Sequence, residues 1–399
     1  MVKDDAKIMD EFKNVHEKTV IDTSKKLKIG IIGCGNRLGS LLGLLEANED
    51  MRITAVGDPD LNAMREKFAL RGYMPDLYAS ADEMLSSEEL DGVMIGTRCS
   101  LHTPMALKAA AKNVPVFLEK PVCTSWEQYY ELKKLLPVAD RFVVSFPLRL
   151  TNLIREVKKL LAADVIGRIE HVEAFNDVFY GRGYYKKWYR DDSETGGLFL
   201  QKATHDFDYI LDLLGDETPL RISAVSSKRV FRGDMPAGQK CSDCKMAAEC
   251  PESPVNLEKA GEPANGPYCC FAVDTGNQDS GSALIEFVSG LHVVYTQDFI
   301  VRKKAGRRGA RLIGYKGTLE FDFRTSEITL YSHFEDKVET FKVPNTGNHS
   351  GGDSILINDF ADLVRKEGRS HANLADGLAS ARLCLAARDS AEKHVFVTL

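Results

Sequence analysis

The sequence predicts an α/β protein of two domains: the first built on a parallel sheet, the second an α+β domain with a large, mostly antiparallel open sheet. Short apolar strands alternate with helices up to about residue 150. Longer strands follow, in which apolar and polar residues alternate. At 399 residues the chain is too long for one ordinary hydrophobic core, which favours two domains.

The first domain is predicted over residues 27–148, after a polar N-terminal arm over residues 1–26. A buried strand at 28–32 runs into a glycine-rich loop, which leads into an apolar helix. Further strands are expected at 52–57, 92–96 and 116–119, with helices at 61–70 and 103–112 between them. Strands separated by helices in this way form βαβ units, so a Rossmann dinucleotide-binding domain is expected.

The second domain is predicted over residues 149–399 and is expected to bind substrate and to mediate oligomerisation. It opens with a helix at 151–161 and closes with helices at 355–366 and 374–393. Alternating strands are expected at 168–176, 221–230, 281–288, 291–299 and within 310–343. Such alternation is typical of an antiparallel sheet with one covered face. The other face is open to a second subunit, so a homodimer or homotetramer is expected.

Composition argues against several classes of function. The net charge is −6, from 52 basic and 58 acidic residues, so no nucleic-acid partner is expected. No apolar run is long enough for a membrane span, and residues 1–26 lack the apolar core of a secretory signal. Scattered single cysteines suit a reducing compartment, so a cytoplasmic location is expected.

The glycine-rich loop is Gly33-Cys34-Gly35-Asn36-Arg37-Leu38-Gly39, in which Leu38 takes the usual third glycine position. Its glycines let the backbone approach a pyrophosphate at a helix N-terminus, although a tight turn in any α/β protein is the alternative. Asp58 ends the second strand, 19 residues after Gly39, where a carboxylate can accept hydrogen bonds from ribose hydroxyls. Its charge would repel a 2′-phosphate, so NAD is favoured over NADP. The expected cofactor-binding residues here are Gly33, Gly35, Asn36, Arg37, Leu38 and Asp58.

Two further segments carry candidate chemistry. Glu119-Lys120-Pro121 ends a buried strand at the edge of the sheet where ligands of parallel α/β folds bind, although a surface lysine is the alternative. Residues 196–208 predict a helix with Gln201, His205 and Asp208 on one face. A histidine beside a carboxylate is a proton-transfer unit near neutral pH, although a packed structural histidine is the alternative.

Together these motifs resemble the Gfo/Idh/MocA family, which includes glucose–fructose oxidoreductase and inositol dehydrogenase. The resemblance extends over residues 27–399 and includes Phe146-Pro147-Leu148-Arg149 and His349-Ser350-Gly351-Gly352-Asp353. It implies that Lys120 contacts a substrate oxygen near the nicotinamide and that His205 relays the proton accompanying hydride transfer. A cation beside the oxygen stabilises developing alkoxide charge, and histidine can give or take the proton.

One position departs from the family pattern. Many members carry an aspartate four residues before the histidine, where this chain has Gln201 followed by Lys202. Asp206 or Asp208 is then the expected acidic partner of His205, and Lys202 is either a second pocket cation or solvent-directed. The remaining expected site residues are Thr97, His102 and Glu119 near the cofactor, and Arg149 and Tyr189 near the substrate. The aromatic loop over residues 176–192 suits either the face of a sugar or a contact between subunits.

A Pro/Gly-rich inserted loop over about 232–276 holds five cysteines. Cys241 and Cys244 have the spacing with which two thiolates share a metal. With Cys250 and Cys269 they are expected to close a structural zinc site or to bind another metal, and a disulfide or free thiols are the alternatives.

The leading interpretation is an NAD(P)-dependent enzyme that moves a hydride between nicotinamide and a secondary hydroxyl or carbonyl of a sugar, glycoside, polyol or inositol. A second interpretation is an NAD-dependent enzyme that uses transient oxidation to cleave or eliminate a glycoside. A third is a non-catalytic protein that senses dinucleotide, against which the presence of both Lys120 and His205 argues.

Overall fold

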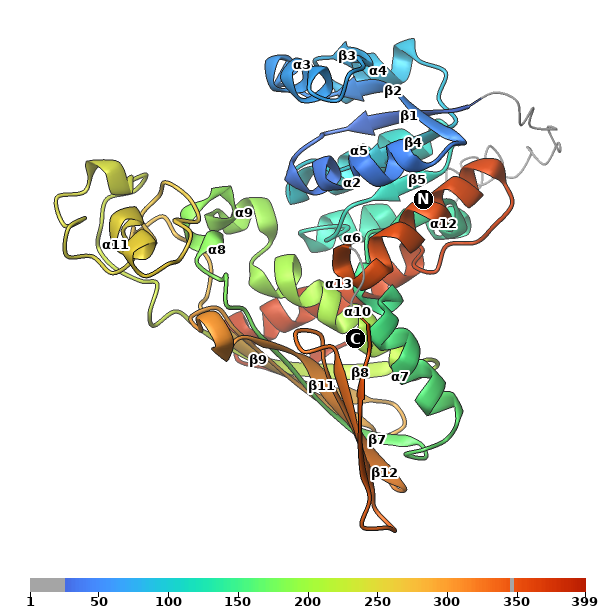
Figure 1. Ribbon diagram of the computed structural model, residues 1–399, viewed down its shortest axis with the longest axis vertical. Helices are drawn as coiled ribbons and strands as arrows, with labels where there is room; N and C mark the ends of the chain where they lie inside the picture. The colour runs from blue at the N-terminus through green and yellow to red at the C-terminus, as the bar shows by residue number, and fades with distance from the viewer. Residues whose placement is uncertain (1–25, 345–347) are drawn as a thin grey trace, which may run out of the picture.

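The structure is a computed structural model that describes residues 26–344 and 348–399. It contains two sheets, one near each end of the molecule, with helices between and around them (Figure 1). The predicted arm over residues 1–26 lies outside the described residues, except for Lys26.

The first sheet has six parallel strands in the order β3-β2-β1-β4-β5-β6. Its strands are β1 (Leu27–Ile32), β2 (Met51–Gly57), β3 (Asp76–Tyr78), β4 (Gly92–Ile95), β5 (Val116–Leu118) and β6 (Phe142–Val144). The connecting helices are α2 (Asn36–Ala47), α3 (Leu61–Ala69), α4 (Ala81–Ser87), α5 (His102–Ala110) and α6 (Trp126–Lys133). This order confirms the predicted Rossmann fold and places the carboxyl ends of all six strands along one edge.

A helix from the C-terminal part of the chain completes this domain. Helix α12 (Gly352–Arg365) buries Leu356, Ile357 and Phe360 in the same apolar cluster as β1 and α2. Residues after the predicted domain boundary at 148/149 therefore pack on the first sheet. Helix α12 covers part of a face of this sheet that the helices of residues 27–148 leave uncovered.

The second sheet has nine strands in the order β14-β13-β12-β11-β7-β10-β9-β8-β15. All neighbours pair antiparallel except β7 and β10, which are parallel. The strands are β7 (Ile169–Asp177), β8 (Pro219–Ser227), β9 (Ser280–Phe287), β10 (His292–Asp298), β11 (Arg307–Gly314), β12 (Gly317–Asp322), β13 (Glu327–Ser332), β14 (Val338–Lys342) and β15 (Val397–Thr398). This confirms the predicted open, mostly antiparallel sheet.

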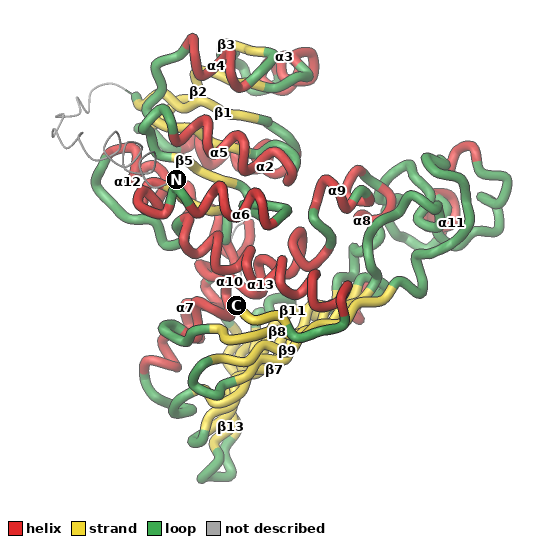
Figure 2. Tube along the Cα trace, turned by 180° about the vertical axis from the view of Figure 1, so that it is seen from behind, coloured by secondary structure: helices red, strands yellow, loops and turns green. Residues whose placement is uncertain are grey.

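Helices cover one face of this sheet and leave the other open (Figures 1 and 2). They are α7 (Asn152–Ala162), α10 (Thr204–Leu214) and α13 (Leu374–Lys393). Along β9 and β10 the covered face holds Ala283, Ile285, Val293 and Tyr295, while the residues between them point away. The period of two predicted from sequence therefore sorts the side chains by face.

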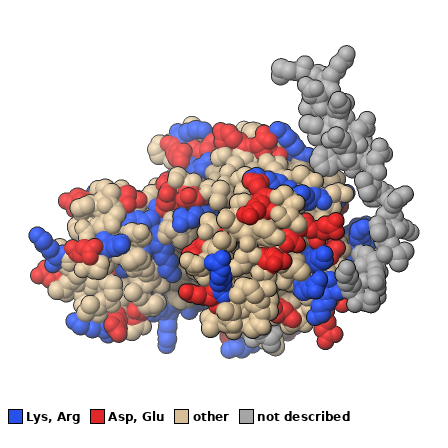
Figure 3. All heavy atoms as spheres, turned by 90° about the horizontal axis from the view of Figure 1, so that it is seen from above, with Lys and Arg blue, Asp and Glu red and all other residues tan. Residues whose placement is uncertain are grey.

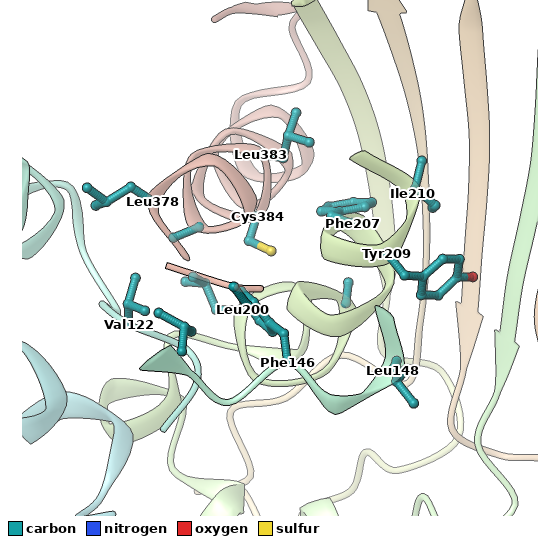
Figure 4. Packing of buried hydrophobic residues seen from close by; sticks show 14 of the residues in the cluster. Val122, Phe146, Leu148, Leu200, Phe207, Tyr209, Ile210, Leu378, Leu383 and Cys384 are labelled. Atoms are coloured by element: carbon teal, nitrogen blue, oxygen red, sulfur yellow. The ribbon is translucent and has the colours of Figure 1, made fainter. Parts of the chain in front are cut away.

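A continuous apolar core joins the two domains (Figure 4). Val122 and Phe146 come from the first domain, and they pack in one cluster with Leu200, Leu378 and Cys384 of the second. This junction holds the edge of the first sheet against the segment that precedes α10.

The cysteine-rich insertion forms a lobe beside the second sheet. The lobe contains α11 (Pro254–Lys259) and is coloured yellow in Figure 1. Beside the lobe, on the side that faces the rest of the molecule, lie α8 (Gly183–Lys186) and α9 (Asp192–Thr195) (Figure 1). The lobe packs on a small apolar cluster that includes Tyr185, Phe231 and Cys270.

In the part of the chain that the structure describes, no helix is both long and apolar enough to span a membrane. On the face shown in Figure 3, acidic and basic side chains are interspersed and do not gather into one patch of either sign.

Candidate active site

The glycine-rich loop connects β1 to α2 at the carboxyl edge of the first sheet. Gly33 has a φ of +73°, and a Cβ there would lie 2.8 Å from the backbone nitrogen of Thr97, so glycine is required. Gly35 caps α2 without a side-chain hydrogen bond. The first N–H groups of α2 are therefore left for an anion such as a pyrophosphate.

Asp58 lies at the adjacent strand end, directly after β2. Its carboxylate accepts hydrogen bonds from the backbone N–H groups of Cys34 and Asp60, each at 3.0 Å. The side chain is thus held beside the glycine-rich loop. A carboxylate in this place can accept hydrogen bonds from a ribose.

Arg37 links the glycine-rich loop to two other parts of the chain. Its guanidinium donates to both carboxylate oxygens of Asp353 at 3.0 and 2.6 Å, and its Nε lies 3.1 Å from the buried Glu119. His349 contacts the same Asp353 at 2.8 Å. Burial raises the pKa of Asp353, but hydrogen bonds from His349 and Arg37 lower it to about 2.

Lys120 follows β5, after Glu119 and before a cis peptide bond to Pro121. Its ammonium donates to the backbone carbonyl of Gln201 at 2.7 Å, so it already reaches the second domain. Burial lowers the pKa of Lys120 to about 8, and the neighbouring charge of Lys202 adds to the lowering. A lysine of this kind can stabilise an alkoxide while it remains protonated.

Both ring nitrogens of His102 contact backbone carbonyl oxygens. Its Nδ1 lies 2.7 Å from the carbonyl oxygen of Pro121, and its Nε2 lies 3.3 Å from that of Thr97. The ring therefore bridges the loops that follow β4 and β5, and burial lowers its pKa.

The segment before α10 departs from the predicted regular helix. Residues Phe199–Ala203 form a π-helical turn, and α10 begins only at Thr204. The extra residue in this turn changes which side chains share a face, and such bulges are frequent at functional sites. His205 lies just after it and lines the same cavity as Lys120.

Neither predicted acidic partner reaches His205, which corrects that expectation. Asp206 accepts hydrogen bonds from Asn176, Tyr295 and Arg308, and Asp208 pairs with Arg149. The buried Nδ1 of His205 has no hydrogen-bond partner among the described residues. Burial, followed by the charges of Lys120, Arg308 and Lys202, lowers the pKa of His205 well below its usual value, so the ring is neutral.

Lys202 is 5% exposed and lines the cavity. Its ammonium donates a hydrogen bond to the hydroxyl of Tyr180 and lies 4.7 Å from the centre of that ring. Of the two predicted alternatives, the structure thus places Lys202 in the pocket rather than in solvent.

Residues of both domains line one cavity of about 230 Å³. The predicted site residues that line it are Arg37, Thr97, His102, Glu119, Lys120, Tyr189, Gln201, Lys202 and His205. Gly96, Cys99, Arg308 and His349, which were not predicted as site residues, also line it. Of the aromatic loop, Tyr180, Tyr184, Trp188 and Tyr189 form one wall. Sequence reasoning missed Arg308, because a basic residue in an alternating strand is usually solvent-exposed.

Arg149 lies elsewhere. It is buried in an ion-pair network with Asp208 at 2.5 Å and Asp376 at 3.3 Å, and it does not line the cavity that contains Lys120. Arg149 therefore connects α10 to α13 and is not placed to touch a substrate in this cavity.

The predicted metal site is not supported by the structure. All cysteines of the lobe are free thiols, and no group of three or more His, Cys, Asp or Glu within 26–344 and 348–399 is arranged to hold a metal. Ion pairs join Glu252 of the lobe to Arg182 and Arg302, which lie outside it, and so attach the lobe to the rest of the protein.

The residues at the sheet edge fit a nicotinamide dinucleotide. The free helix N-terminus suits the pyrophosphate, Asp58 suits a ribose, and the cavity beyond the strand ends can take the nicotinamide. The fold and this site define an oxidoreductase with a Rossmann nucleotide-binding domain.

Two family models match this chain and identify its family. Residues 27–145 match the model described as "Oxidoreductase family, NAD-binding Rossmann fold", and residues 154–320 match the "GFO/IDH/MocA C-terminal domain". The chain therefore belongs to the Gfo/Idh/MocA family, as the motifs predicted.

Individual relatives are distant. The chain is 26% identical over 338 residues to YteT of Bacillus subtilis, named as an oxidoreductase, which covers 74% of this chain and 78% of that protein. It is 27% identical over 203 residues to scyllo-inositol 2-dehydrogenase (NAD⁺) of the same organism, covering 48% of this chain and 55% of that protein.

Solved structures share the fold over almost the whole chain. Levoglucosan dehydrogenase in complex with NADH and levoglucosan has a TM-score of 0.73 at 18% identity, covering 94% of this chain and 99% of that one. An oxidoreductase domain protein from Kribbella flavida has a TM-score of 0.74 at 16% identity, with the same coverage.

Proposed function

We propose that this protein is an NAD-dependent dehydrogenase or reductase acting on a secondary hydroxyl or carbonyl of a sugar, glycoside, polyol or inositol. The observation that carries the proposal is the convergence of Lys120 and His205, from different domains, on one cavity at the carboxyl edge of the first sheet. Ligands of open α/β sheets bind at this edge.

The chemistry divides between cofactor and protein. When bound, the nicotinamide supplies the acceptor or donor of the hydride. Lys120 stabilises the alkoxide charge that develops on the substrate oxygen. The neutral ring of His205 shapes the pocket beside it, and Tyr184, Trp188 and Tyr189 offer the aromatic surface on which the apolar face of a sugar ring packs.

Asp58 supports NAD as the cofactor in preference to NADP. Its carboxylate is held beside the glycine-rich loop and would repel the 2′-phosphate of NADP. The names of several relatives support the substrate class, because inositol 2-dehydrogenase of Rhizobium meliloti and levoglucosan dehydrogenase both act on cyclic polyhydroxy compounds.

The test is a screen for NAD reduction over sugars, glycosides and inositols, repeated with Lys120→Ala and His205→Ala. Removing the Lys120 ammonium is expected to lower kcat by about 10²- to 10³-fold, the usual cost of one group that stabilises an oxyanion. The exposed Lys133→Ala on α6 is the matched lysine control. Full activity of both Lys120→Ala and His205→Ala on the best substrate would overturn the assignment.

We also propose that the protein is a cytoplasmic homo-oligomer whose subunits meet through the open face of the second sheet, without a nucleic-acid or membrane partner. Val225, Leu284 and Val294 lie on this face of adjacent strands and are 63%, 39% and 41% exposed. Val294→Glu is expected to release monomers in sedimentation velocity. An unchanged sedimentation coefficient for this variant would exclude the face as the interface.

A further inference from the structure

The proton that accompanies hydride transfer needs an acceptor, and His205 is poorly suited to be one. Its buried Nδ1 has no partner among the described residues, and Asp206 and Asp208 are engaged with other groups. Protonation would add a charge beside Lys120, Lys202 and Arg308. A base whose protonated form is destabilised by burial and by like charges holds a proton weakly.

Tyr180 has the opposite environment. Its hydroxyl accepts a hydrogen bond from Lys202, whose ammonium lies 4.7 Å from the centre of the ring. Burial raises the pKa of Tyr180, but the charges of Lys202 and Arg308, the hydrogen bond from Lys202 and the charge of Lys120 together lower it below its usual value of 10. The cations therefore stabilise the phenolate.

The tyrosine is also accessible. It is 43% exposed and lines the same cavity as Lys120 and His205, in the loop between β7 and α8. The charged or titratable groups around it come from several elements: Lys120 after β5, Tyr184 on α8, Tyr189 after it, Lys202 in the π-helical turn and Arg308 on β11.

We propose that Tyr180 is the catalytic residue that accepts the substrate hydroxyl proton, and that Lys202 is the positioning residue that holds its hydroxyl oxygen and stabilises the phenolate. In the oxidative direction the O–H proton passes to the Tyr180 oxygen and the C–H hydride, with its electron pair, to oxidised nicotinamide. The substrate carbon becomes a carbonyl, NAD⁺ is reduced to NADH, and the tyrosine proton then leaves to solvent. This assignment rests on the proposed dehydrogenase function.

Gln201 holds Lys120 through its backbone, whose carbonyl accepts the hydrogen bond from that lysine, so this contact does not depend on the glutamine side chain. The side chain itself cannot carry the charge that an aspartate there would provide. Lys202 follows directly, so one turn of chain orients both lysines of the pocket.

The first experiment is kinetic and uses the NAD-loaded protein with the best substrate of the screen. Tyr180→Phe is expected to lower kcat by about 10²- to 10⁴-fold, the usual contribution of general acid–base catalysis, while NADH affinity stays unchanged. Lys202→Met is expected to move the acidic limb of the kcat/KM profile to higher pH, and Lys202→Arg to restore part of the shift. His205→Ala is expected to lower the rate but to leave that limb in place. The exposed Tyr315→Phe is the tyrosine control.

The second experiment needs no turnover. Ultraviolet difference absorbance of the protein without cofactor follows tyrosinate formation as pH rises. One tyrosine is expected to ionise below the usual range, to disappear in Tyr180→Phe and to move upward in Lys202→Met. Absence of this early step, or a Tyr180→Phe variant with the parent kcat, would overturn the proposal. An early step in a protein that oxidises no member of the panel would contradict the dehydrogenase function and leave the Tyr180–Lys202 pair established.

Discussion

The side chain of Leu38 occupies the space that any side chain on Gly96 would need. A Cβ on Gly96 would lie 2.4 Å from the Cγ of Leu38 and 3.1 Å from the carbonyl oxygen of Gly33. Leu38 is fully buried, so it has no room to withdraw. The irregular third position of the glycine-rich loop is thus compensated by a glycine at the end of the neighbouring strand β4.

Gly96→Ala is therefore expected to destabilise the protein by about 1–3 kcal/mol, the usual range for overpacking, and to weaken NAD binding. Urea unfolding and NADH fluorescence titration measure the two effects. Gly43→Ala in α2 is the control, because no atom outside its own stretch of helix lies within 4 Å of its Cβ position, and it is expected to leave stability equal or slightly higher. Equal stability of Gly96→Ala and the parent would contradict the packing argument.

Asp58→Asn is expected to reverse part of the cofactor preference. The amide keeps a hydrogen-bond acceptor for the N–H of Cys34 but loses the charge that repels a 2′-phosphate. The Kd for NAD is expected to rise by about 10-fold, as for loss of one charged hydrogen bond, and the Kd for NADP to fall. Calorimetric titration with both cofactors measures this, and Asp82→Asn on the exposed side of α4 is the control. An unchanged ratio of the two Kd values would remove Asp58 from the ribose site.

Arg149→Met is expected to change stability and to leave substrate KM alone. Arg149 and Asp208 form a buried ion pair at 2.5 Å, outside the cavity. Removing one partner of a buried pair costs about 3–5 kcal/mol of unfolding free energy. Arg149→Met with Asp208→Leu is expected to recover part of this loss, since the fully buried Asp208 charge is removed together with its partner. A large rise in KM with unchanged stability would instead return Arg149 to the substrate site.

The Asp353 carboxylate is expected to make stability depend on pH in the acidic range. Its pKa is about 2 in the folded chain, against an ordinary value of 3.8, so the unfolded state binds the proton first. The stabilisation is present above pH 3.8 and is lost as pH falls towards 2, and it amounts to about 2 kcal/mol.

Urea unfolding of Asp353→Asn between pH 2 and pH 6 tests this dependence. The parent is expected to be the more stable near pH 6, and the two proteins are expected to converge near pH 2. The exposed Asp336→Asn, in the turn between β13 and β14, is expected to follow the parent throughout. Parallel curves for the parent and Asp353→Asn would show that Asp353 carries no such linkage.

Local patterns were sufficient for most strands of the two sheets and for the cofactor edge. The alternation of strands and helices predicted β1, β2, β4 and β5 but not the three-residue strands β3 and β6, and the period of two predicted the region of β7 to β14, because these periods report which side chains face the core. The glycine-rich loop, Asp58 and Lys120 could be placed together because the carboxyl ends of parallel strands meet at one edge. The π-helical turn could not be predicted, since its residues also suit an ordinary helix.

The sequence by itself determined the order of elements, the family and the chemical groups at the strand ends, all of which depend on neighbours along the chain. Only the tertiary structure decided the partners of the charged groups. It paired Asp208 with Arg149 and Asp206 with Arg308, left His205 without an acid, and brought Lys202 to Tyr180. Such pairings join residues from about 20 to about 100 positions apart. Their energies depend on burial and on the summed field of the pocket, which no local pattern records.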